Sequence, residues 1–152
     1  MLSVISDDEV SQWFGQRILM RVDYNCPMSD GRVTDATRID RTIAGITRLT
    51  GAGASVILMS HFGRPKGIRH PEMCLAPMQA YLSDKLGYDV AIADDICGTG
   101  AAEMVSALAP GKVMMLENLR FHAGEEANDP DFAASLALLG DIFVSDAFSC
   151  AH

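Results

Sequence analysis

The sequence has few of the features that mark exported, membrane-spanning or nucleic-acid-binding proteins. Residues 1–9 lack the basic start and the apolar core of a signal peptide. No apolar run approaches the roughly 20 residues that a membrane-spanning helix needs. Aromatic residues make up only 7% of the chain and the formal net charge is -8, which disfavours broad binding to nucleic acid. We therefore expect a soluble protein with no nucleic-acid partner and no membrane partner.

Cysteine is scarce and widely spaced, at Cys26, Cys74, Cys97 and Cys150. No two of these residues form a Cys-x-x-Cys pair, and their spacing fits no metal finger, so the sequence predicts no metal site. Separate thiols are typical of proteins in a reducing compartment. We therefore expect a cytoplasmic protein.

Glycine-rich phosphate loops are also missing. No Gly-Lys-Ser/Thr loop occurs, and Gly51-x-Gly53 and Gly98-x-Gly100 match only part of a dinucleotide signature. Both glycine pairs fit the turns at helix ends better. We therefore expect no residues in this chain that bind a nucleotide cofactor.

Basic residues are in the minority but are not evenly spread. Lys and Arg number 12 against 20 Asp and Glu, in a chain that is 49% hydrophobic. Half of the basic residues lie in or beside four polar loops: Arg21, Arg38, Arg64, Lys66, Arg69 and Arg120. This pattern predicts a locally positive field on an acidic body, which suits a small, highly charged metabolite better than a polymer.

Predicted strands alternate with predicted helices along the 152 residues, a length typical of one domain. Apolar runs predict strands at 17–22, 56–59, 112–116 and 141–144, with a weaker strand at 89–93. Helical spacing predicts helices at 38–50 and 101–108, one around Met78 and Leu82 that ends at Gly87, and one opened by Asp129-Pro130. This order predicts an α/β fold with three layers and a mostly parallel sheet.

Two finer details complete the predicted fold. Ser6 and Glu9 have the spacing of a capping box, which predicts a short helix near the amino terminus. The helix at 38–50 should bury a single stripe, formed by Ile39, Ile43, Ile46 and Leu49. Residues 27–31 are expected to form a loop.

Four predicted strands end in polar or basic loops. Ile18–Arg21 leads into residues 22–27, Val56–Met59 into 60–67, Val113–Leu116 into 117–122 and Ile142–Val144 into 145–148. Open α/β sheets bind ligands just beyond the carboxyl ends of their strands. Two of the four loops carry Arg and His, and Arg21 directly precedes a third, so the sequence predicts an oxygen-rich anion as the ligand.

Asp23 and Asn25 follow the first strand at alternate positions. Their side chains should point to the same side and could hold a substrate hydroxyl, because Asp accepts hydrogen bonds and Asn both donates and accepts. An Asp/Asn turn that bonds its own backbone would also account for them.

Arg38 begins the next helix, where the helix dipole disfavours a cation. A bound anion, a salt bridge to Asp35 or a solvent-facing pose could each explain it.

The loop at residues 61–67 carries the strongest local signal. Arg64 offers a planar fork of donors that matches phosphate or carboxylate oxygens, and His61 could donate a further hydrogen bond. A solvated basic loop is the alternative.

Arg120 follows another firm strand, at 112–116. An ion pair with Glu125 or Glu126 is the alternative to ligand binding there.

Five motifs follow one another along nearly the whole chain. They are Arg21-Val22-Asp23-Tyr24-Asn25-Cys26-Pro27, Thr34-Asp35-Ala36-Thr37-Arg38-Ile39, residues 57–67, residues 116–122 with Gly124-Glu125-Glu126, and residues 145–152. Together they closely resemble the amino-terminal domain of phosphoglycerate kinase. One such motif would be a weak signal, whereas five in the family's order make chance a poor explanation.

The resemblance implies a Rossmann-like domain that binds 3-phosphoglycerate or 1,3-bisphosphoglycerate. Asp23 and Asn25 would position the glycerate. His61, Arg64 and Arg120 would hold the phosphate that is not transferred. The family's reaction moves a phosphoryl group between 1,3-bisphosphoglycerate and ADP, which gives 3-phosphoglycerate and ATP in glycolysis.

The resemblance also implies a catalytic role for Arg38, which would stabilise the phosphoryl group during transfer. Such transfer is catalysed mainly by positioning and by charge stabilisation. Mg-ADP or Mg-ATP would be bound by a second domain that this chain lacks. The protein is expected to be a monomer.

The sequence departs from the family pattern towards its end. Ser149 and Cys150 replace a pair that is more usually Gly-Thr, and the family pattern continues beyond His152 with a substrate-binding Arg. We therefore expect residues 1–152 to form a substrate-binding domain that is incomplete at its carboxyl end and does not turn over alone. The alternative is a stand-alone anion-binding or interaction module, a truncated paralogue without catalysis.

Overall fold

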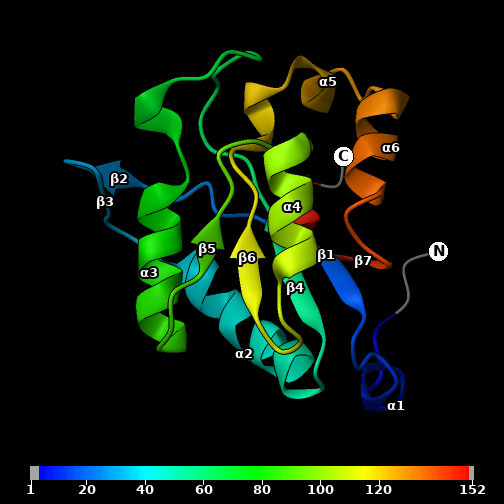
Figure 1. Cartoon of the computed structure of the whole chain (residues 1–152). Coiled ribbons are helices and arrows are strands. Elements are labelled where there is room, and N and C mark those ends of the chain that lie inside the picture. Colours follow the sequence, from blue (N-terminus) through cyan, green and yellow to red (C-terminus); the bar gives the residue numbers. More distant parts are fainter. Residues whose placement is uncertain (1–3, 151–152) are drawn as a thin grey trace.

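A five-stranded sheet lies at the centre of the molecule (Figure 1). The computed structural model describes residues 4–150. The strands of this sheet are β1 (Arg17–Val22), β4 (Ser55–Met59), β5 (Ala91–Ile92), β6 (Val113–Met115) and β7 (Ile142–Asp146). Their order is β5-β6-β4-β1-β7, and each neighbouring pair runs parallel. The predicted α/β fold with a mostly parallel sheet is confirmed.

Local sequence explains where several helices begin and end. The helices are α1 (Asp7–Ser11), α2 (Thr37–Gly51), α3 (Ala76–Leu86), α4 (Thr99–Ala107), α5 (Ala123–Glu126) and α6 (Pro130–Ala137), with short 3-10 turns at Pro71–Met73, Leu119–Phe121 and Phe148–Cys150. The predicted capping box of Ser6 and Glu9 opens α1, and Gly87 ends α3 with a φ of 78°. Within the described residues, no helix has both the length and the apolar character that a membrane crossing requires.

Alternate residues of the central strands enter two separate hydrophobic cores. Ile18 and Met20 of β1 belong to the core that includes residues of α2 and α3, whereas Leu19 belongs to the core that includes residues of α4 and α6. β4 and β6 alternate in the same way. Figure 1 accordingly shows α4 in front of the sheet and α2 behind it. Helices thus cover both faces, which gives the predicted three layers.

Residues 27–31 hold more structure than the expected loop. β2 (Met28–Ser29) pairs with antiparallel β3 (Arg32–Val33), and between them Asp30 and Gly31 have φ angles of 50° and 72°. Positive φ at both positions is the geometry of a tight hairpin turn, which Asp-Gly favours. The two strands are too short to show a two-residue alternation in sequence, so the prediction missed them.

The buried stripe of α2 differs from expectation at one position. Ile43 is only partly buried, while the other three predicted positions are buried and Thr42 is buried with them. Thr42 Oγ1 lies 2.7 Å from the Tyr24 hydroxyl oxygen. Thr42 Oγ1 also donates to the Ile39 carbonyl oxygen over 2.7 Å, which leaves Tyr24 as the donor to Thr42, so the Thr42 hydroxyl is satisfied within the core.

Candidate functional site

The loops after β1, β4 and β6 meet at the carboxyl edge of the sheet. The Tyr24 N–H donates to Ser60 Oγ over 2.9 Å, and the Gly63 N–H donates to Asn25 Oδ1 over 3.0 Å. The Leu119 N–H donates to the Ser60 carbonyl oxygen, also over 3.0 Å. These bonds run from each loop to the next. The three loops therefore form one continuous surface at the place where open α/β sheets bind ligands.

One buried amide joins the second and third of these loops. Asn118 is 0% exposed. Its Oδ1 accepts from the N–H groups of Phe62 and Arg120, each at 3.1 Å, and its Nδ2 donates to the carbonyl oxygens of Phe62 at 2.8 Å and Met73 at 2.9 Å. The amide oxygen and the amide nitrogen thus each make two hydrogen bonds. The backbones near Arg64 and at Arg120 are consequently held by the same side chain.

Asp23 and Arg38, two of the predicted site residues, form an ion pair. Arg38 Nη1 donates to Asp23 Oδ2 over 2.7 Å, and the side chains are 48% and 13% exposed respectively. Arg38 therefore pairs with Asp23 rather than with Asp35. Burial raises the pKa of Asp23, but hydrogen bonds from Ser149, from the Asn25 N–H and from Arg38 outweigh it, so the pKa lies below its ordinary value. Asp23 is ionised at neutral pH.

Asn25 lies beside this pair. Asp23 Oδ1 accepts from the Asn25 N–H over 3.1 Å, so the Asp/Asn turn that the sequence suggested is present. The turn uses the Asn25 backbone, and no hydrogen bond within residues 4–150 uses Asn25 Nδ2. Asn25 and Arg38 also line an open pocket of about 560 Å³. The turn is therefore compatible with a contact between the Asn25 side chain and a ligand.

His61 is buried, with 6% of its surface exposed. Its Nδ1 lies 3.1 Å from Arg21 Nη2. Because a guanidinium only donates, Nδ1 is the acceptor and the proton of the neutral ring is on Nε2. Burial lowers the pKa of His61, and the positive charges of Arg120 and Arg21 lower it further. At neutral pH His61 is an uncharged ring with one N–H left to donate.

Arg120 is held from two sides. Its Nε donates to Glu125 Oε2 over 3.2 Å, and Glu126 Oε1 lies 3.8 Å from the same nitrogen. The ion pair that was the alternative explanation for Arg120 is therefore present. Arg120 Nη1 also donates to the Gly63 carbonyl oxygen over 3.2 Å. Since Gly63 directly precedes Arg64, this bond brings Arg120 to the loop that carries Arg64.

The remaining basic residues of these loops differ in how firmly they are held. Arg64 and Lys66 are exposed, and across residues 4–150 no hydrogen bond or ion pair holds the Arg64 side chain. Arg69 donates to the Asp94 carbonyl oxygen over 2.6 Å and lies 3.7 Å from Glu117. Direct contacts thus join Asp23 to Asn25 and Arg38. Asn25 and Arg120 both bond Gly63, and His61 is linked to Arg120 through Arg21 and Glu125, with Arg64 on the same loop as His61.

Two residues of this cluster were not among the predicted site residues. Arg21 contacts both His61 and Glu125, and Ser149 Oγ donates to Asp23 Oδ2 over 2.5 Å. Arg21 had a usable sequence signal, because it is an arginine that follows three apolar residues in β1. Ser149 had no local signal, since its partner is 126 positions away.

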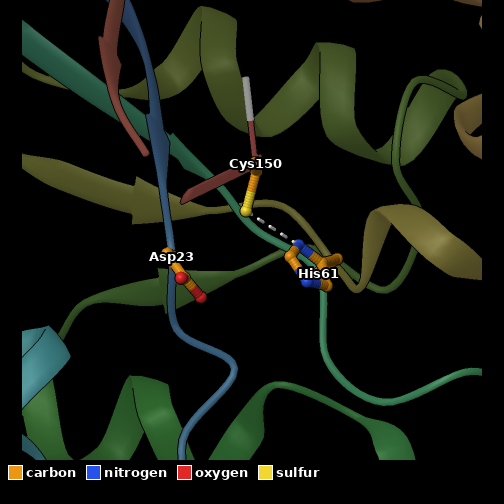
Figure 2. A group of neighbouring side chains, drawn as sticks. All are labelled: Asp23, His61 and Cys150. Carbon is orange, nitrogen blue, oxygen red and sulfur yellow. Dashed lines mark hydrogen bonds between the residues drawn. The ribbon is translucent and has the colours of Figure 1, made fainter. Parts of the chain in front are cut away.

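Asp23, His61 and Cys150 form a group that could hold a metal ion (Figure 2). One ligand atom of each lies within 4.8 Å of the others, and Cys150 Sγ is 3.9 Å from His61 Nδ1. Cysteine spacing could not reveal this group, because its members come from three distant segments. Arg38 and Arg21 already donate to Asp23 and His61. A cation would have to compete with both guanidinium groups, so the cluster favours an anionic ligand.

Known protein sequences match this chain over nearly its whole length. Residues 8–152 match the family model described as "Phosphoglycerate kinase". A phosphoglycerate kinase of Methylorubrum extorquens is 54% identical over 145 residues, which is 95% of this chain and 36% of that relative. One of Azorhizobium caulinodans is 55% identical over 138 residues, which is 91% of this chain and 35% of that relative.

Two solved structures share the fold. The phosphoglycerate kinase of Coxiella burnetii superposes with a TM-score of 0.82 at 36% identity, covering 92% of this chain and 34% of that one. The phosphoglycerate kinase of Pyrococcus horikoshii OT3 gives a TM-score of 0.81 at 32% identity, covering 92% of this chain and 36% of that one. The chain spans about a third of the length of the relatives it matches.

Proposed function

The chain belongs to the phosphoglycerate kinase family, and we propose that it is the amino-terminal, substrate-binding part of such an enzyme. The complete enzyme transfers a phosphoryl group between 1,3-bisphosphoglycerate and ADP, with 3-phosphoglycerate and ATP as products. The observation that carries the proposal is the cationic cluster at the carboxyl edge of the sheet. There Arg38 contacts Asp23, Arg21 contacts His61, and Arg120 contacts the loop that carries Arg64.

We assign Asp23 and Asn25 to the glycerate part of the substrate. Asp23 is ionised, and it is a strong acceptor for a substrate hydroxyl. Asn25 can donate from Nδ2 while its Oδ1 stays bonded to the Gly63 N–H. The two residues together suit a ligand that carries a hydroxyl beside a carboxyl group.

We assign His61, Arg64 and Arg120 to the phosphate that is not transferred. His61 presents its Nε2–H because its Nδ1 accepts from Arg21. Arg120 adds a guanidinium on a side chain that is 24% exposed, and Arg64 adds one on an exposed side chain. Guanidinium and imidazole donors around one anion are the usual means of phosphate recognition.

Arg38 is the catalytic residue of this proposal. Its side chain is 48% exposed, and exposed ion pairs contribute only about 0–1 kcal/mol, so Arg38 can leave Asp23 for an incoming carboxyl phosphate. Once there, it stabilises the charge on the phosphoryl group in transfer. The rest of catalysis is positioning, for which no covalent nucleophile is needed.

Mg-ADP or Mg-ATP belongs to another domain of the complete enzyme in this proposal. Three guanidinium groups converge at the candidate site and already pair with its carboxylates, Asp23 and Glu125, so the cluster suits phosphate oxygens and repels Mg²⁺. These residues therefore do not fit a magnesium site. The proposal further holds that residues 1–152 bind substrate but do not transfer phosphate alone, and that the protein is a cytoplasmic monomer.

Titration of the ¹⁵N-labelled chain with 3-phosphoglycerate tests this assignment. We expect amide shifts at residues 23–25, 38, 61–64 and 120, and weaker binding of inorganic phosphate, which lacks the glycerate. A stand-alone anion-binding module would instead bind both ligands equally well. If no amide of these segments moves at millimolar 3-phosphoglycerate, the proposed function is wrong.

A further inference from the structure

We propose that Glu125 is a positioning residue that holds Arg21 and Arg120 in the geometry needed for phosphate binding. The proposal rests on the function proposed above, and it adds a residue that makes no contact with substrate itself. Glu125 lies in α5, at the carboxyl edge of the sheet in Figure 1. It acts through two arginines that reach it from separate elements, Arg21 from β1 and Arg120 from the turn at Leu119–Phe121.

Each carboxylate oxygen of Glu125 serves one arginine. Oε1 accepts from Arg21 Nη2 over 3.3 Å, and Oε2 accepts from Arg120 Nε over 3.2 Å. The Glu125 side chain is 14% exposed, while Arg21 and Arg120 are 18% and 24% exposed. Low exposure limits screening by solvent and salt, so the Glu125 carboxylate attracts these two arginines more strongly than a surface carboxylate would. Without it, two neighbouring guanidinium groups would repel each other.

The influence of Glu125 extends to His61. Arg21 Nη2 contacts both Glu125 and His61 Nδ1, so the carboxylate fixes the group that sets the tautomer of the ring. With Arg21 in place, His61 keeps its proton on Nε2. If Arg21 moved away, Nδ1 would lose its guanidinium donor and keep only the weak, 3.9 Å contact with the Cys150 thiol, so both neutral tautomers of His61 would become populated.

The backbone that carries Glu125 is itself rigid. The His122 ring stacks on Phe132 with 4.2 Å between centroids and accepts a hydrogen bond from the Gly124 N–H over 3.0 Å. A side chain at Gly124 would come within 2.9 Å of Phe132 Cβ, so α5 and α6 approach as closely as glycine permits. A fixed backbone is what a residue needs to position others.

The affinity of the Glu125→Gln variant for 3-phosphoglycerate distinguishes a positioning role of Glu125 from a purely electrostatic one. The substitution removes one negative charge beside an anion site. If Glu125 only balanced charge, the variant would bind 3-phosphoglycerate more tightly. If it positions Arg21 and Arg120, we expect affinity to fall about tenfold, equivalent to one well-placed charge-assisted hydrogen bond.

Glu126→Gln is the matched control. It removes the same charge one residue further on, but Glu126 is 52% exposed and lies 3.8 Å from Arg120 Nε. We expect its affinity to stay within about twofold of the unaltered chain, as for other exposed ion pairs. Equal affinities of Glu125→Gln and the unaltered chain, or equal losses in both variants, would overturn the proposal.

Imidazole ¹⁵N shifts of His61 give a readout that needs no substrate. We expect a single Nε2–H tautomer in the unaltered chain and in Glu126→Gln, and a tautomer mixture in Glu125→Gln. Melting curves identify any loss of fold, and Glu125→Asp then serves as the milder variant. If the unaltered chain fails to bind 3-phosphoglycerate, the proposed function fails. If His61 keeps one tautomer in Glu125→Gln, the positioning role fails independently.

Discussion

Asp23 accepts a 2.7 Å hydrogen bond from Arg38, so the residue proposed to hold the glycerate is paired with the residue proposed to act on the phosphoryl group. The pair leaves Asp23 nearly buried and Arg38 half exposed. Arg38 is therefore the more accessible member of the pair. Substrate binding would exchange one carboxylate partner of Arg38 for a phosphate, which keeps its charge balanced throughout.

Arg38→Ala should affect catalysis far more than folding. We expect the free energy of unfolding to change by less than about 1 kcal/mol, because the ion pair is partly exposed. In the complete kinase we expect turnover to fall by about 10²-fold or more, the scale for loss of a group that stabilises transition-state charge. Steady-state kinetics beside urea denaturation measure both effects. Arg48→Ala is the control, because Arg48 lies in the last turn of the same helix, is 41% exposed and pairs with Asp7 away from the site. Near-normal turnover of Arg38→Ala would contradict the assigned role.

His61 should make stability depend on pH. Its pKa in the folded chain is lowered by burial and by Arg120 and Arg21, so the unfolded chain binds a proton more readily. The stabilisation is complete above about pH 6.5, the ordinary histidine pKa, and is lost as the pH falls through the folded value. We expect the free energy of unfolding to fall between pH 7.5 and pH 5.5, and to fall less in His61→Gln.

Urea denaturation at a series of pH values checks this dependence. His70→Gln is the control, because the His70 side chain is 40% exposed. It should keep the pH dependence of the unaltered chain. Parallel curves for His61→Gln and the unaltered chain would mean that burial of His61 is not the cause.

Gly67→Ala should disturb the site as well as the fold. Gly67 has a φ of +77°, and a side chain there would come within 3.0 Å of Ala123, the first residue of α5. Gly87 has a φ of +78° with nothing within 4 Å, so Gly87→Ala carries the same backbone strain without the collision. We expect a loss of about 1 kcal/mol in Gly87→Ala and about 2–3 kcal/mol in Gly67→Ala. Thermal denaturation measures the difference, and 3-phosphoglycerate affinity should fall only in Gly67→Ala.

Tyr24→Phe should destabilise the core without charge effects. The Tyr24 hydroxyl lies 2.7 Å from Thr42 Oγ1, and Tyr24 is 0% exposed. Removing it leaves a buried Thr42 oxygen with fewer partners, at a cost of about 1 kcal/mol. Tyr88→Phe is the control, since no hydrogen bond in the part that the structure describes uses the Tyr88 hydroxyl. Equal unfolding energies for both variants would show that the Tyr24–Thr42 contact is not stabilising.

Periodicity was sufficient to predict the strands and helices that bury apolar faces. The β1 bounds agree with the predicted strand, and α2 extends the predicted helix by one residue at each end. The hairpin of β2 and β3 was missed because two-residue strands carry no alternation. Burial of Thr42 was missed because its hydroxyl pairs in the core with the hydroxyl of Tyr24, which lies 18 positions away in the sequence.

The candidate site was predictable in its donors but not in the contacts between them. Loop position after the strands and the family motifs identified the cationic residues. The Arg21–Glu125 contact spans 104 positions, and the contact between His61 and Cys150 spans 89. Such contacts depend on strand order, because β7 lies next to β1 although it is the last strand in the chain. Local patterns contain no information on that order.

Asn118 has a consequence for selectivity. Its amide oxygen and its amide nitrogen each make two hydrogen bonds to backbone groups. The Arg64 segment and the Arg120 turn therefore cannot shift independently of each other when a ligand binds. Asn118 thus fixes the spacing between the backbone of the Arg64 segment and that of the Arg120 turn. Under the proposed function, Asn118 would therefore favour a phosphate that fits this spacing, because the two segments cannot adjust separately to a different anion.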